Sequence, residues 1–97
     1  MRNMSLNYIE ETWKLKTNSA NELFNKNQYE KSLKLYKEAL IQAELLNENP
    51  DFAKFSDFTF VPIFAISCNN LAFNYEELKQ VENGKEMLQR AIYFILI

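Results

Sequence analysis

The chain has 97 residues, which is enough for one domain, and we treat 1–97 as a single unit. Hydrophobic residues make up 47% and aromatic residues 14% of it, with one glycine and two prolines, so the composition excludes a disordered chain and a turn-rich β fold and favours helices. The formal net charge is −2 and the lysines are interleaved with glutamates, so the basic patch of a nucleic-acid-binding protein is missing.

Two residue types limit the chemistry. The chain has no histidine and one cysteine, Cys68, which removes Cys–His and Ser–His pairs, most zinc sites and any internal disulfide. We therefore expect a non-enzymatic protein without a cofactor or metal, with Cys68 as a buried, inert thiol. We expect no signal peptide in the first residues, and the apolar ending "AIYFILI" is too short to span a membrane. We expect a cytoplasmic protein.

Apolar residues that recur every three or four positions predict the first helix, Leu6 to about Asn25. Asn27 followed by Glu30 has the spacing of a helix N-cap and its reciprocal acid, so a second helix is expected to begin here. Its apolar face continues to Leu46. Residues 6–46 therefore form the first predicted hairpin.

The helical pattern breaks at residues 47–59, where Pro50 and three acidic residues predict a connecting insertion rich in aromatic residues. Pro62 suits the first turn of a third helix, which continues to about Leu78. The polar "KQVEN" predicts a tight turn, and a fourth helix carries the apolar residues from Met87 to the end. The predicted fold is all-α, with four helices in two antiparallel hairpins, the second at 60–97.

The two predicted hairpins repeat each other in sequence. Aligning Ala20 with Ala72, an offset of 52 residues, also brings Tyr36 onto Leu88 and places alanines opposite each other near the end of each unit. The stretches "ANELFNKNQYEKSLKLYKEAL" and "NNLAFNYEELKQVENGKEMLQRAI" resemble two tetratricopeptide repeats separated by an insertion. The resemblance implies right-handed stacking of the hairpins. An unrelated four-helix bundle is the alternative, because any antiparallel hairpin needs small residues where its helices cross.

The same resemblance implies a concave, peptide-binding groove along the first and third helices. The residues that would line it are mostly amides and aromatics, which suit an extended peptide. They are Lys14, Thr17, Asn18, Asn21, Phe24, Asn69, Asn70, Phe73 and Glu76. Asn21 and Asn70 match two asparagines with which some relatives of that family hold a terminal carboxylate. The alternative is that both asparagines bond to nearby backbone.

Five phenylalanines gather in and beside the insertion, which is more than a simple connection needs. They are Phe52, Phe55, Phe58, Phe60 and Phe64. We expect them to close the end of a small core, because a short chain needs its aromatic residues for its own interior. A lid or an anchor for a partner is the alternative.

The end of the fourth helix lacks a polar outer face, which a terminal helix in water normally has. We therefore predict a homodimer interface formed by Tyr93, Phe94, Leu96 and Ile97. A following helix from a longer chain, or the aromatic insertion folded back, could cover the same residues.

The function that these patterns predict is an interaction module, or adaptor, that binds a peptide segment of a protein partner, with no nucleic-acid or membrane partner. The alternatives are a structural oligomerisation unit and a small regulator of a larger enzyme. No residue in the sequence identifies the partner.

Overall fold

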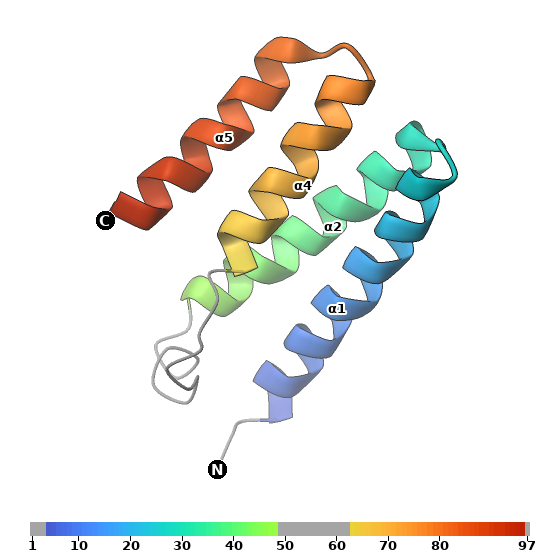
Figure 1. Ribbon diagram of the computed structural model, residues 1–97. Coiled ribbons are helices and arrows are strands. Elements are labelled where there is room, and N and C mark those ends of the chain that lie inside the picture. The colour runs from blue at the N-terminus through green and yellow to red at the C-terminus, as the bar shows by residue number, and fades with distance from the viewer. Residues whose placement is uncertain (1–3, 49–62, 97) are drawn as a thin grey trace.

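The computed structural model describes residues 4–48 and 63–96, which form four helices. They are α1 (Met4–Asn25), α2 (Tyr29–Glu48), α4 (Ile63–Glu77) and α5 (Val81–Leu96), and they pack as neighbours in the order α1, α2, α4, α5 (Figure 1). The described residues contain no strand. The prediction of an all-α fold with two helical hairpins, α1–α2 and α4–α5, is therefore confirmed. No described helix is long and apolar enough to cross a membrane.

The turn of the first hairpin differs from the prediction. Asn27 has a φ of 63°, and its N–H bonds to the carbonyl of Phe24 while the N–H of Gln28 bonds to that of Leu23. This is the Schellman ending of α1, with Asn27 at the left-handed position that asparagine tolerates. The carbonyl of Gln28 accepts the first α2 bond, from Ser32. Gln28 is therefore the N-cap, and the N-cap role predicted for Asn27 is wrong.

The turn of the second hairpin repeats this geometry 52 residues later. Lys79 has a φ of 64°, its N–H bonds to the carbonyl of Glu76, and the N–H of Gln80 bonds to that of Tyr75. Gln80 then accepts the first α5 bond, from Gly84. The repeat seen in the sequence is thus present in the backbone, and both turns lie at the same end of the row of helices (Figure 1).

A small residue lies at each hairpin crossing. In the first hairpin the buried Ser32 hydroxyl donates to the Ala20 carbonyl at 2.8 Å. In the second, a methyl group at Gly84 would lie 3.4 Å from the Ala72 carbonyl oxygen. In both hairpins the two helices therefore approach each other at small residues, and these residues are related by the same 52-residue offset.

The core lies between the hairpins. Leu33, Tyr36 and Leu40 of α2 are buried there. The α4 residues buried with them are Ala65, Cys68, Leu71, Ala72 and Tyr75. The buried Asn74 amide also crosses from α4 to α2, where its nitrogen donates to the Tyr29 carbonyl at 3.0 Å and its oxygen accepts from the Leu33 N–H at 3.2 Å. The hairpins are thus joined by two hydrogen bonds inside an apolar interface.

The aromatic insertion is only partly described. Of the five phenylalanines in and beside it, Phe52, Phe55, Phe58 and Phe60 lie outside the described residues. Phe64 packs against the core, with its ring 5.2 Å from that of Phe94.

Candidate functional site

A concavity of about 390 Å³ opens where α1, α2 and α4 meet. Phe24 comes from α1 and Tyr36 from α2. The other four lining residues, Asn70, Phe73, Glu76 and Glu77, lie on the C-terminal half of α4. Three helices thus contribute one surface, which is the kind of place where ligand sites form in helical proteins.

The spacing of α1 and α4 beside this concavity is held by a direct bond. Trp13 donates its indole N–H to the Ser67 hydroxyl at 2.7 Å. Ser67 lies one turn before Asn70 on α4, and Trp13 lies three turns before Phe24 on α1. The bond therefore holds the two helices together at the end of the concavity that is farther from the hairpin turns.

Tyr36 is held in place by its hydroxyl. The group donates a hydrogen bond to Oδ1 of Asn21, and burial raises the pKa of Tyr36 above its ordinary value. The hydroxyl therefore remains a neutral donor at physiological pH, and it orients the Asn21 amide beside the concavity. On the α1 side, the Phe24 ring meets the Tyr29 ring edge-on at 5.1 Å, which fixes the Phe24 side chain.

The lining of the concavity combines an exposed ring with negative charge. Phe73 is 61% exposed, whereas its chain neighbours Ala72 and Asn74 are buried. Glu76 and Glu77 stand one turn further along α4, and among the described residues no lysine or arginine lines the concavity. The arrangement can accept an apolar side chain beside a cation, with the Asn70 amide available to a peptide backbone.

Four of the nine residues predicted for the groove line this concavity, namely Phe24, Asn70, Phe73 and Glu76. A fifth, Asn21, adjoins it through its bond to Tyr36. The sequence missed two lining residues. Tyr36 lies on the apolar face predicted for the second helix, and Glu77, which follows Glu76 directly, is typical of a solvated helix face.

The other four predicted residues do not line the concavity. Lys14 is exposed and pairs along its own helix with Glu10 at 3.5 Å and Glu11 at 3.7 Å. Asn18 and Asn69 are exposed as well. Thr17 is buried, and its hydroxyl has no hydrogen-bond partner among the described residues.

The residues of the concavity disfavour binding of a terminal carboxylate by Asn21 and Asn70. Asn21 already accepts the Tyr36 hydroxyl, and the two glutamates would repel a terminal carboxylate at the position of Asn70. A cationic ligand fits this lining better than an anionic one.

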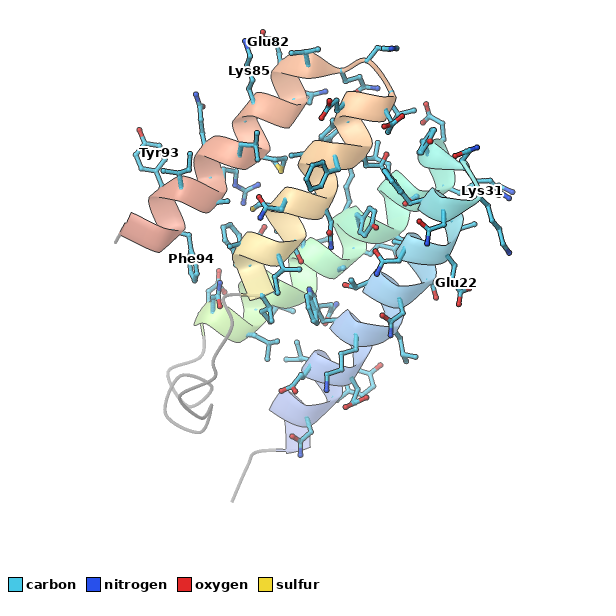
Figure 2. All side chains as sticks on the ribbon, in the orientation of Figure 1. Glu22, Lys31, Glu82, Lys85, Tyr93 and Phe94 are labelled. Carbon is cyan, nitrogen blue, oxygen red and sulfur yellow. The ribbon has the colours of Figure 1, made fainter. Side chains whose placement is uncertain are left out.

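The residues predicted for a dimer interface occupy different surroundings. Tyr93 is 68% exposed and points away from the other helices (Figure 2). Phe94 packs against the core through Phe64, over which the Arg90 guanidinium lies at 5.3 Å. The side chains of Leu96 and Ile97 lie outside the described residues.

Cys68 is fully buried, as predicted, and burial raises the pKa of its thiol. Within residues 4–48 and 63–96, no group of three or more histidine, cysteine, aspartate or glutamate side chains is arranged to hold a metal ion.

Comparison with known proteins corrects the family assignment. No curated protein and no solved structure matches the chain. A family model matches residues 11–96, and it is not a tetratricopeptide model. The predicted tetratricopeptide membership is therefore wrong, because small residues at a crossing with large ones beside them are required by any antiparallel helical hairpin. The chain belongs to the family described as protein of unknown function DUF2753.

Proposed function

We propose that the protein is a non-enzymatic interaction module that binds a peptide segment of a protein partner in the concavity formed by α1, α2 and α4. The observation that carries the proposal is the exposed Phe73 ring beside the Asn70 amide and the carboxylates of Glu76 and Glu77. No side chain among the described residues covers this ring, so it offers apolar contact area to a ligand.

The lining selects the chemistry of the peptide. An apolar side chain would contact Phe24 and Phe73, and a lysine or arginine next to it would face the two glutamates. The Asn70 amide both donates and accepts, so it can pair with an extended peptide backbone. We therefore propose a segment in which an apolar residue adjoins a basic one.

The sequence supports a binding role over catalysis, since a chain without histidine lacks the commonest general base. We infer a cytoplasmic location, because the one cysteine is buried and has no second cysteine with which to form a disulfide.

Fluorescence anisotropy with labelled peptides tests the proposal. The probes are two otherwise identical peptides, one with Leu-Lys and one with Leu-Glu at the centre, and we expect only the first to bind. Glu77→Lys and Asn70→Ala should each weaken binding by roughly tenfold, the usual scale for a contact in a buried interface centre. Tyr93→Ala, which removes an exposed ring outside the concavity, is the control.

Equal binding of the two peptides would contradict the proposed charge selection. Unchanged binding by both Glu77→Lys and Asn70→Ala would exclude the concavity as the site. Circular dichroism of each variant checks that the helices are intact.

A further inference from the structure

A second apolar groove lies on the outer side of the α4–α5 hairpin. It encloses about 260 Å³, and its lining includes Ala72, Phe73, Glu76, Val81, Lys85 and Leu88. Phe73 is 61%, Val81 57% and Leu88 46% exposed. The apolar row continues along α5 to Ile92, which is 55% exposed. We call this surface the outer groove.

The row on α5 has the spacing of one helix face. Leu88 follows Val81 by seven residues and Ile92 follows Leu88 by four, so the three side chains point to the same side. A helix with such a stripe normally packs it against another element. In the described part of the chain, nothing covers this one.

The internal repeat shows what kind of element fits. At the 52-residue offset, Leu88 corresponds to Tyr36 and Ile92 to Leu40, and these α2 residues are buried because α4 packs on them. The outer groove is therefore the face of the second hairpin that corresponds to the helix-binding face of the first. A helix is the element that this face accepts.

We propose that the occupant is a second copy of this chain, bound through the same outer groove in a two-fold symmetric dimer. Area supports this. At roughly 150 to 200 Å² per large apolar side chain, the exposed parts of the four apolar residues amount to roughly 400 Å². A standard interface buries about 800 Å² on each partner, a little over half of it apolar. The patch has the apolar area of one such interface.

The charges of the outer groove are also self-complementary. Glu76 lines it from α4 and Lys85 from α5. A two-fold axis through the groove brings Glu76 of each copy toward Lys85 of the other, giving two equivalent pairs. Among the described residues of one chain, Lys85 pairs with Glu82 at 3.7 Å, and both side chains are largely exposed, as Figure 2 shows at the turn end of α5. Little is lost when Lys85 changes partner.

This interface differs from the one predicted at the end of α5. Tyr93 follows Ile92 directly and so points about 100° away from the apolar row. The outer groove shares Phe73 and Glu76 with the peptide concavity but extends along α5, which does not line the concavity. Substitutions on α5 therefore test the dimer separately from peptide binding.

Light scattering and sedimentation of the full 97-residue chain give the test, over about 1 to 200 µM. The expected species is a dimer of twice 11.5 kDa. Leu88→Glu should weaken dimerisation at least tenfold while the helical circular dichroism stays unchanged. Leu15→Glu, which changes a leucine of α1 that is 67% exposed, is the matched control and should leave the dimer intact.

A charge exchange gives a second, independent test. Lys85→Glu alone should weaken the dimer by placing two glutamates together, and adding Glu76→Lys should restore it. A monomer throughout the concentration range would overturn the proposal, and so would equal loss of dimer with Leu15→Glu and Leu88→Glu. Failure of the double variant to recover would overturn the two-fold pairing of Glu76 with Lys85.

Discussion

Lys79 at the turn of the second hairpin provides a direct test of the backbone geometry. Its φ of 64° lies in the middle of the left-handed region, where a side chain crowds the following carbonyl. The two bonds of the Schellman ending involve only main-chain atoms of residues 75–80, with lengths of 3.0 and 2.8 Å. A substitution at Lys79 can therefore change the conformational cost of this position and keep the turn intact.

Lys79→Gly should stabilise the protein. The left-handed conformation costs an L-residue about 1 to 2 kcal/mol, which glycine avoids. Glycine loses about 0.5 to 1 kcal/mol more backbone entropy than alanine on folding. The net gain is about 0.5 to 1 kcal/mol, which corresponds to a rise in Tm of roughly 2 to 8 °C for a domain of this size. At the equivalent turn Asn27→Gly should gain less, because asparagine already tolerates φ of 63° and its Oδ1 accepts the Tyr29 hydroxyl at 2.8 Å.

Thermal and urea unfolding followed by circular dichroism measure these differences at one fixed protein concentration, because a dimer makes Tm depend on concentration. Lys79→Ala is the control, since it removes the charge and keeps the Cβ atom. We expect no stabilisation from it. If Lys79→Ala raises Tm as much as Lys79→Gly does, the lysine charge and not the left-handed backbone is responsible, and the reasoning is refuted.

Three further predictions concern the interior and one ion pair. Asn74→Ala should lower the free energy of unfolding by about 2 to 3 kcal/mol in urea titrations, because it leaves a cavity and removes the hydrogen bonds of the amide to α2. Asn69→Ala, at an exposed position of the same helix, is the control and should change the free energy of unfolding by less than about 0.5 kcal/mol. Cys68 should react with a thiol reagent far more slowly in the native protein than in urea, and equal rates would contradict its burial and raised pKa. The hydrogen bond from Lys16 at 2.7 Å lowers the pKa of Glu38. The stability that this bond contributes is therefore present above the pKa of Glu38 in the unfolded chain, and it is lost as the pH falls through the pKa of Glu38 in the folded protein. Glu38→Gln should therefore cost up to about 1 kcal/mol at pH 7 and nothing near pH 2, and a cost that persists in acid would exclude the ion pair as its cause.

The hairpins were predictable because their signals are local. Periodic apolar residues define a helix face, and the small residues at positions 20, 32, 72 and 84 define the two crossings. The role of Asn27 was not predictable in this way. Asparagine suits both an N-cap and a left-handed ending, and only the bond from Gln28 to Leu23 decides between them.

The candidate site was predicted only in part because it depends on how the hairpins pack. The groove prediction placed Thr17 and Asn18 on one open face of α1. In the structure Thr17 is buried, Trp13 on the same helix bonds to Ser67 of α4, and the opening lies at Phe24. The residue pattern within either helix does not indicate a contact between residues 54 positions apart.

Because of the order of the helices in the row, the outer helices and the inner helices should open locally at different rates. The inner helices α2 and α4 pack on both sides, whereas the outer helices α1 and α5 each have one main neighbour. Local opening of an outer helix exposes one interface, and its amide protons should exchange with solvent through small fluctuations that leave the inner pair closed. Amides of α2 and α4 should exchange only when the whole row separates. If α5 acquires a second neighbour across the outer groove, its exchange, unlike that of α1, will become slower as the protein concentration rises.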